Sequence, residues 1–175
     1  MIYKLGELKL NINQVELIPV RLESKSELEN LMSYYLHDLS EFADDLKISE
    51  DGKFKYDGME LYLSEKDLKP FFINFNGENI GFILLNTGRY VPKGIDYIIN
   101  EFFILKGYRR KGLGASSIKK LMDVFKGTYF VKELLDNKLA VSFWKRFYKR
   151  QGIQFDENSV LSDGFECIIQ RFEIK

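Results

Sequence analysis

The sequence predicts a single α/β (α+β) domain in which a mixed, mostly antiparallel central sheet carries helices on both faces. Three observations indicate this fold. Two apolar runs flank Asn76-Gly77, as in a β-hairpin. A β-prone run leads through a basic, glycine-rich turn into a helical pattern, and a strand, a second amphipathic helix and two extended segments follow. A chain of 175 residues that is 45% apolar can bury one substantial core.

The first part of the chain mixes extended and helical patterns. Ser24 or Ser26 can cap a helix, because a serine oxygen accepts a hydrogen bond from a free amide of the first turn. Gly52 and Gly58 lie among many charged residues, as is typical of a loop. In order, we expect an extended arm over residues 1–13, followed by one domain over residues 14–175 that opens with a strand at 15–22, helices at 24–37 and 40–46 and a loop at 48–69.

The middle of the chain contains its best hairpin signal. Asn and Gly both tolerate the positive φ angles of a type I′ turn, so Asn76-Gly77 predicts a tight turn between two strands. The predicted elements are strands at 70–75 and 80–85, a turn at 87–94 and a further strand at 96–105.

A basic, glycine-rich turn follows that strand. From Ala115 the apolar residues fall on one helical face, so the turn lies between a strand and the start of a helix. Such a turn presents free backbone N–H groups to an anion, and its glycines allow close approach. Arg109, Arg110 and Lys111 add positive charge. The turn therefore predicts a site for a phosphate-bearing ligand.

Two common phosphate loops do not fit this turn. A Walker loop needs Gly-Lys after its four-residue gap, but Leu113 follows Gly112. The dinucleotide fingerprint needs a third glycine where Ser117 stands.

A second amphipathic helix is predicted downstream. Leu139, Phe143 and Phe147 recur at helical spacing; Asn137 is a plausible N-cap and Gly152 a plausible stop. The remaining predicted elements are a strand at 128–134 before this helix and an antiparallel pair at 153–155 and 165–172 after it.

Together the two motifs resemble those of the GNAT superfamily of N-acetyltransferases. Arg109-Arg110-Lys111-Gly112-Leu113-Gly114 is similar to the family's Arg/Gln-x-x-Gly-x-Gly/Ala signature, and the segment from Asn137 to Trp144 to its Asn-x-x-Ala-x-x-Phe-Tyr/Trp segment. The resemblance implies acetyl-CoA as co-substrate, and a splayed sheet in which the fourth strand pairs with the pantetheine arm. The cofactor-binding residues that it implies are Phe103, Ile104, Leu105, Arg109, Arg110, Lys111, Gly112, Leu113, Gly114, Ala115, Asn137, Phe143 and Trp144.

The resemblance also implies catalytic residues. Glu101 lies on the strand where many relatives carry a carboxylate that takes the amine's proton; a structural carboxylate is the alternative. Trp144 stands where many relatives have a tyrosine that protonates the thiolate, and indole supplies no useful proton. Tyr148 is the candidate substitute, with aromatic packing as its alternative. His37 is the sole histidine and is expected to be solvated or capping.

The acceptor is expected to be a small-molecule amine, on the strength of aromatic and acidic residues around the first two helices. Aromatic rings and carboxylates suit a cationic amine such as a polyamine, amino sugar or lysine-like amine, although a solvated acidic helix explains the same pattern. The residues concerned are Tyr34, Tyr35, His37, Asp38, Glu41, Asp44, Asp45, Tyr56, Glu60 and Tyr62.

Charge and composition limit the other partners. Residues 106–150 hold 13 basic and 3 acidic side chains, whereas residues 23–69 hold 6 basic and 13 acidic ones. The basic half coincides with both motifs and suits a polyanionic coenzyme. No nucleic-acid signature accompanies it, and no apolar run is long enough to span a membrane. Cys167 is the one cysteine, which excludes an internal disulfide and a cysteine metal cluster.

Several functional interpretations stay open at this stage. We expect a cytoplasmic N-acetyltransferase that needs no metal and that acts by direct attack of the amine in a ternary complex. The alternatives are an acetyl-CoA sensor or degenerate relative without turnover, and an interaction protein on the same fold. A homodimer is also open, since the arm at residues 1–13 could add a strand to a neighbour.

Overall fold

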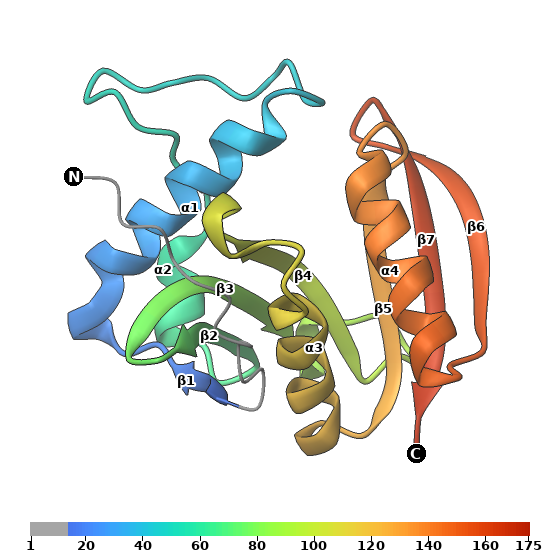
Figure 1. The fold of residues 1–175 in the computed structure, drawn as a ribbon. Coiled ribbons are helices and arrows are strands. Elements are labelled where there is room, and N and C mark those ends of the chain that lie inside the picture. The colour runs from blue at the N-terminus through green and yellow to red at the C-terminus, as the bar shows by residue number, and fades with distance from the viewer. Residues whose placement is uncertain (1–13) are drawn as a thin grey trace.

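The computed structural model describes residues 14–175, so the predicted arm at residues 1–13 lies outside the described residues. Seven strands form one sheet in the order β1-β2-β3-β4-β5-β7-β6, and every neighbouring pair is antiparallel except β4 and β5 (Figure 1). The predicted mixed sheet is confirmed. The strands are β1 (Val15–Pro19), β2 (Leu68–Phe75), β3 (Glu78–Asn86), β4 (Tyr97–Ile104), β5 (Gly127–Leu134), β6 (Phe155–Ser162) and β7 (Phe165–Ile174).

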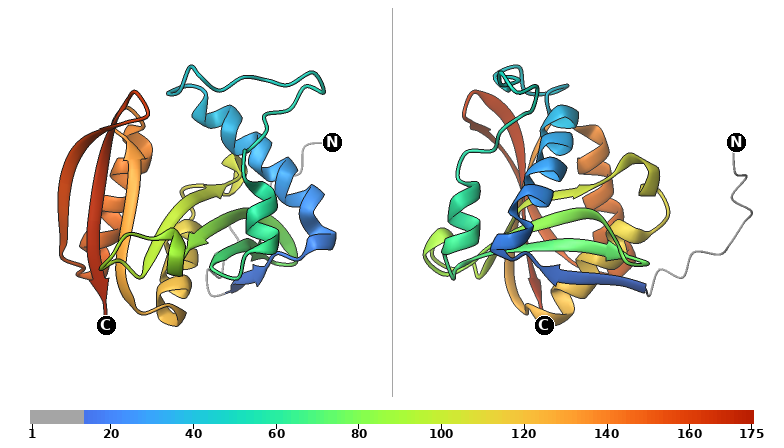
Figure 2. Two further views of the ribbon diagram at one scale, coloured as in Figure 1. Left: turned by 180° about the vertical axis from the view of Figure 1, so that it is seen from behind. Right: turned by 90° about the vertical axis from the view of Figure 1, so that its left-hand side faces the viewer.

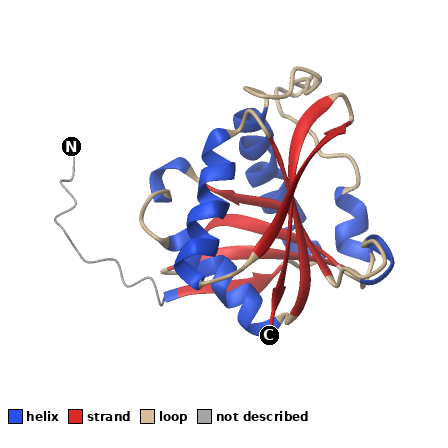
Figure 3. Cartoon of the chain, turned by 90° about the vertical axis from the view of Figure 1, so that its right-hand side faces the viewer, coloured by secondary structure: helices blue, strands red, loops and turns tan. Residues whose placement is uncertain are grey.

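Helices cover both faces of this sheet, as Figures 2 and 3 show. Helices α1 (Lys25–Leu39) and α2 (Met59–Ser64) pack on one face, against Phe72, Phe82 and Phe103. Helices α3 (Leu113–Val124) and α4 (Lys138–Gln151) pack on the other, where Tyr129 and Phe172 lie. Two apolar cores, one on each side of the sheet, therefore hold the domain together. The helices of residues 14–175 are all too short or too polar to cross a bilayer.

Two local predictions near α1 are wrong. Residues 40–46 form turns rather than a helix, and Ala43 is the one buried residue among them. So little buried apolar surface cannot hold a short helix. Residues 48–69 contain α2 and the start of β2. Helix α2 forms because Met59 and Tyr62 are buried in the α1 core, a long-range effect that six residues of local pattern do not reveal.

Several turns and caps are confirmed. Asn76 (φ 55°) and Gly77 (φ 85°) both take the left-handed conformation of a type I′ turn. The Asn137 side chain accepts a hydrogen bond from the Ala140 amide at 3.1 Å, so it caps α4 as predicted. The first strand of the last pair differs from its prediction. It begins at Phe155 and continues to Ser162, beyond most of the predicted 153–155 segment, because it is an exposed edge strand of mostly polar residues without an apolar pattern.

The centre of the sheet is splayed. Strands β4 and β5 pair in parallel over Tyr97–Ile99 and Tyr129–Val131, and their remaining residues diverge. One step further along β4, its register with β3 shifts, so that Leu84 pairs with Glu101 and Leu85 with Ile99. Asn100 is therefore the extra residue of a β-bulge. The bulge places Ile99 with the α3–α4 core and turns Glu101 toward α1.

Candidate active site

The basic, glycine-rich turn folds into an anion-binding shape at the start of α3. Arg110 (φ 65°) and Gly112 (φ 82°) are both left-handed, and α3 begins at Leu113. The first-turn amides of a helix have no acceptor within the helix, and its dipole favours negative charge there. Backbone groups of Gly112, Leu113, Gly114 and Ala115 thus form the anion site that the sequence predicts.

Gly114 holds this helix start close to its neighbours. A Cβ atom on Gly114 would lie 3.2 Å from Phe102 Cζ on β4 and 3.3 Å from Phe143 Cε2 on α4. These distances are tighter than ordinary van der Waals contact. The glycine therefore sets the spacing between α3, β4 and α4 at the open end of the splay.

The three basic side chains of the turn do not converge on one point. The Lys111 ammonium donates to the Gly107 carbonyl at 2.7 Å, and Arg110 is exposed. The Arg109 guanidinium instead contacts Asp38 on α1 and the Ile104 carbonyl. Of the predicted basic ligands, Arg110 and Lys111 remain at the surface of the turn, and Arg109 is directed toward α1.

The backbone of β4 differs from its predicted role at two residues. The Leu105 amide donates to the Ile80 carbonyl at 2.9 Å, and Phe103, two residues earlier on the strand, has the same direction, so both direct their backbone groups toward β3. Because direction alternates along a strand, Ile104 faces the side of β5, together with Phe102. Of the predicted trio, Ile104 therefore directs its backbone into the splay, and Phe102 is the residue that the sequence analysis missed.

Glu101 lies half-buried under α1 and is held by hydroxyl and amide groups. Tyr35 donates to its Oε2 at 2.5 Å, Tyr56 to its Oε1 at 3.2 Å, and Asn100 to its Oε1 at 3.3 Å. Burial raises the pKa of Glu101 to about 7, although the hydrogen bonds from Tyr35 and Tyr56 and the charge of Lys132 oppose this. A carboxylate with a pKa near 7 can accept a proton at neutral pH.

Further polar groups extend this arrangement. The Tyr62 hydroxyl donates to Asn86 Oδ1 at 2.5 Å, and the Asn100 amide donates to the Tyr56 hydroxyl at 2.9 Å. Burial and then the charge of Glu101 raise the pKa of Tyr56 and Tyr62 well above the ordinary value, so both stay protonated. Asn86 was missed from the sequence, although a polar residue at the end of the apolar β3 run was a usable signal.

The aromatic residues of α4 pack against β4 at the splay and against strands β6 and β7. Phe143 contacts Phe102 at a ring-centroid distance of 5.4 Å, and Trp144 contacts Phe102 at 6.2 Å. Tyr148 is 0% exposed and packs on Phe155 and Phe172. Its hydroxyl has no partner within residues 14–175, and burial raises its pKa far above the ordinary value. This geometry favours the packing role of Tyr148 over proton donation.

Most of the other residues predicted for the acceptor cleft lie away from Glu101. Tyr34 and His37 are exposed on α1, and the His37 ring lies 6.2 Å from that of Phe54. Glu60 pairs with Lys25. The structure thus brings Tyr35 and Tyr56 to the carboxylate, with Tyr62 beside Tyr56, and leaves Glu41, Asp44 and Asp45 on the surface.

Known structures share this architecture. An acetyltransferase from Thermus thermophilus is 15% identical, with a TM-score of 0.63 over 90% of this chain and 96% of that chain. AAC(6')-Ib in complex with ribostamycin and coenzyme A is 14% identical, with a TM-score of 0.67 over 91% and 93%. A GNAT acetyltransferase from Elizabethkingia anophelis with acetyl-CoA bound is 13% identical, with a TM-score of 0.55 over 92% and 99%. At such low identity the likeness shows the fold.

A comparison with curated proteins found no match, but a family model does match the sequence. A model of the Acetyltransferase (GNAT) family matches residues 30–152, which include both motifs, Glu101 and the splayed strands. This chain belongs to the GNAT family of acetyltransferases.

Proposed function

We propose that this protein transfers the acetyl group of acetyl-CoA to a primary amine of a small molecule, by direct attack in a ternary complex. The observation that carries the proposal is the splay between β4 and β5, which has the α3 anion site on one face of the sheet and Glu101 turned to the other. Donor and acceptor could thus approach one opening from opposite sides.

The residues around the splay fit the coenzyme. A pyrophosphate would accept from the backbone amides at residues 112–115, with Arg110 and Lys111 as nearby cations. The backbone groups of Phe102 and the amide of Ile104, which face the side of β5, would pair with the pantetheine arm, while the Ile104 carbonyl accepts from Arg109. Phe143 and Trp144 would flank that arm, and the Asn137 amide would be near it, as the family resemblance implies. Gly114 has no side chain to fill the space between Phe102 and Phe143.

The chain's own residues supply the proton chemistry. When bound, acetyl-CoA supplies a thioester carbonyl that an amine nitrogen can attack. Glu101, ionised above about pH 7, takes the proton that the amine loses, directly or through water. Tyr35 and Tyr56 orient its carboxylate by donating to its two oxygens. The C–S bond then breaks, coenzyme A leaves as its thiolate and takes a proton from water, and the amine nitrogen keeps the acetyl group.

The acceptor we favour is a cationic small amine. Tyr35 and Tyr56 contact the Glu101 carboxylate and Tyr62 lies beside Tyr56, and aromatic rings and carboxylates attract ammonium ions. The complex of AAC(6')-Ib, an aminoglycoside acetyltransferase of the same fold, with ribostamycin supports this choice. A homodimer and a cytoplasmic location stay predictions from the sequence.

One experiment separates the proposed enzyme from its alternatives. Acetyl-CoA at 100 times Kd should stabilise the protein by about 2.7 kcal/mol, which raises Tm by about 5–10 °C. Thiol release should then follow with polyamines, amino sugars or lysine esters. Stabilisation without thiol release across cationic, neutral and anionic amines would favour the acetyl-CoA sensor. The burial of Tyr148 and the tryptophan at position 144 are the two observations that support that alternative. The absence of any thermal shift would favour the interaction protein.

Gly114→Ala should weaken coenzyme A binding about tenfold. The added methyl group meets the side chains of Phe102 and Phe143, which must give way by a few tenths of an ångström, and we expect this to shift the first turn of α3, whose amides hold the pyrophosphate in this proposal. Gly107→Ala is the matched control, because a Cβ there meets nothing within 4 Å, and we expect its Kd to stay within twofold. Isothermal titration measures both. Equal affinities for the two variants would show that the spacing at residue 114 does not matter for binding.

A further inference from the structure

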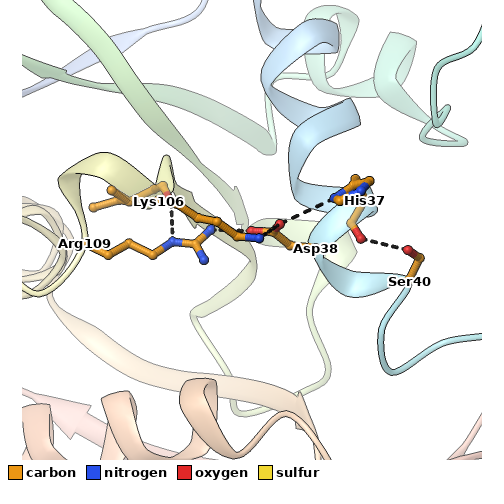
Figure 4. A network of polar contacts seen from close by, with 6 residues as sticks. His37, Asp38, Ser40, Lys106 and Arg109 are labelled. Atoms are coloured by element: carbon orange, nitrogen blue, oxygen red, sulfur yellow. Dashed lines mark hydrogen bonds and ion pairs between the residues drawn. The ribbon is translucent and has the colours of Figure 1, made fainter. Parts of the chain in front are cut away.

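Arg109, the first residue of the phosphate signature, is directed away from the phosphate site. Its Nε donates to the Ile104 carbonyl at 2.6 Å, and its Nη2 donates to Asp38 Oδ2 at 2.6 Å. Its guanidinium also lies over the Phe103 ring, 5.3 Å from the centroid. Phe103 belongs to the α1–α2 core, whereas α3 packs on the opposite face of the sheet. Figure 4 shows the side chain extending toward α1.

Asp38 is the centre of this contact network. Its Oδ2 accepts from Arg109 and its Oδ1 accepts from Lys106 at 2.9 Å, and His37 Nδ1 lies 3.6 Å from the same Oδ1 (Figure 4). Burial opposes its ionisation, but the hydrogen bonds from Lys106 and Arg109 outweigh this and hold the pKa of Asp38 below its ordinary value. The last turn of α1 is thereby tied to the end of β4 and the turn after it.

The same turn of α1 carries Tyr35, three residues before Asp38. Residues three apart share a helix face, and both side chains are directed toward β4. The Phe103 ring connects Tyr35 with the partner of Asp38: it is 5.9 Å from the Tyr35 ring and lies under the Arg109 guanidinium. Any loosening of Asp38 from Arg109 would therefore shift Tyr35 relative to Glu101.

We propose that Arg109 and Asp38 are positioning residues that lock α1 to β4 and so hold Tyr35 against Glu101, and that the Arg109 side chain is not a phosphate ligand. This rests on the proposed function insofar as Glu101 is the base. Arg109 also has a local role. Its Nε donates to the Ile104 carbonyl, which faces the splay, and so satisfies that acceptor. The pyrophosphate is left to the backbone amides, Arg110 and Lys111.

The test compares Arg109→Gln and Asp38→Asn with two matched surface variants. Arg150→Gln removes an exposed arginine from α4, and Asp123→Asn removes an acid from an exposed ion pair with Lys119. For both site variants we expect coenzyme A Kd within threefold of the wild type and kcat/KM for the amine about tenfold lower. The double variant should be no worse than the worse single one, because the two residues act as one unit. Arg109→Lys should restore part of the activity.

The pH profile supplies a readout that simple destabilisation would not move. The groups that contact Glu101 are Tyr35 from α1, Tyr56 from the loop before α2 and the neighbouring Asn100. Lys132 of β5 and Tyr62 of α2 interact with it through charge. Loss of the Tyr35 hydrogen bond removes a contact that favours the carboxylate. The acid limb of kcat/KM should therefore move to higher pH by about 0.5–1 unit in both site variants and stay in place in both controls.

A measurement without coenzyme keeps this inference separate from the proposed function. Amide hydrogen exchange over residues 34–39 of the free protein should be faster in Arg109→Gln and Asp38→Asn than in the wild type. If the wild type binds no coenzyme or releases no thiol, the proposed function fails while the exchange result still stands. A tenfold loss of coenzyme affinity in Arg109→Gln, with unchanged exchange and an unchanged acid limb, would instead assign Arg109 to the phosphate and overturn the inference.

Discussion

Replacing Glu101 by Gln is expected to lower kcat at least 100-fold while coenzyme A binding changes less than threefold. General base catalysis contributes about 10²–10⁴ in rate, and an amide cannot accept the amine's proton. Gln keeps the size of Glu. Its one amide oxygen can still accept from Tyr35 or Tyr56, and its NH2 group can donate to the other hydroxyl oxygen, so the fold around the site is expected to survive. Thiol release at saturating acetyl-CoA and amine measures kcat, and calorimetry measures binding.

The pH dependence of the wild type gives a second check on Glu101. Its pKa of about 7 means that the carboxyl group is protonated, and inactive as a base, at lower pH. With an amine whose own pKa is well below 7, kcat/KM should fall about tenfold for each pH unit below 7. The acid limb should disappear in Glu101→Gln. A variant that keeps more than half of the wild-type rate and the same acid limb would show that Glu101 is a structural carboxylate.

Replacing Glu133 by Gln is expected to stabilise the protein by about 2 kcal/mol at pH 8.5. Glu133 on β5 is 7% exposed, and neither carboxylate oxygen has a partner within residues 14–175. Burial and then the charge of Glu157 raise its pKa to about 8, against the opposing charge of Lys145. If the whole rise of the Glu133 pKa from 4.5 to about 8 acted on stability, the free energy of unfolding would be lowered by about 5 kcal/mol at high pH. We expect less than half of this, because a buried carboxylate relaxes and admits water.

The sign of the pH effect follows from proton release. Between pH 4.5 and about 8 the unfolded chain has lost the Glu133 proton while the folded chain retains it, so stability falls as pH rises through this window. Glu133→Gln should therefore differ from the wild type by less than about 1 kcal/mol at pH 5 and by about 2 kcal/mol at pH 8.5. Urea unfolding at both values measures this. Exposed Glu173→Gln serves as control, and a difference for Glu133→Gln that is constant with pH would contradict the prediction.

Local sequence chemistry was sufficient for much of this fold. Asn76-Gly77, the Asn137 cap and the glycine turn before α3 each depend on residues within a few positions of one another, so the pattern predicts them directly. Helix α2 was missed because its six residues are held in a helix by long-range packing, namely the burial of Met59 and Tyr62 against the core of α1. The exposed strand β6 was missed for a related reason, since pairing with β7 rather than an apolar pattern makes it a strand.

By itself the sequence determined the phosphate turn, the two family motifs and a candidate carboxylate at Glu101, because each is a matter of residue type and spacing. Tertiary structure alone decided which way those residues face. The bulge at Asn100 turns Glu101 toward Tyr35 and Tyr56, and Asp38 draws Arg109 away from the α3 start. Both outcomes depend on contacts between segments more than 40 positions apart. No local pattern encodes such contacts, since they form only when α1 packs on β4.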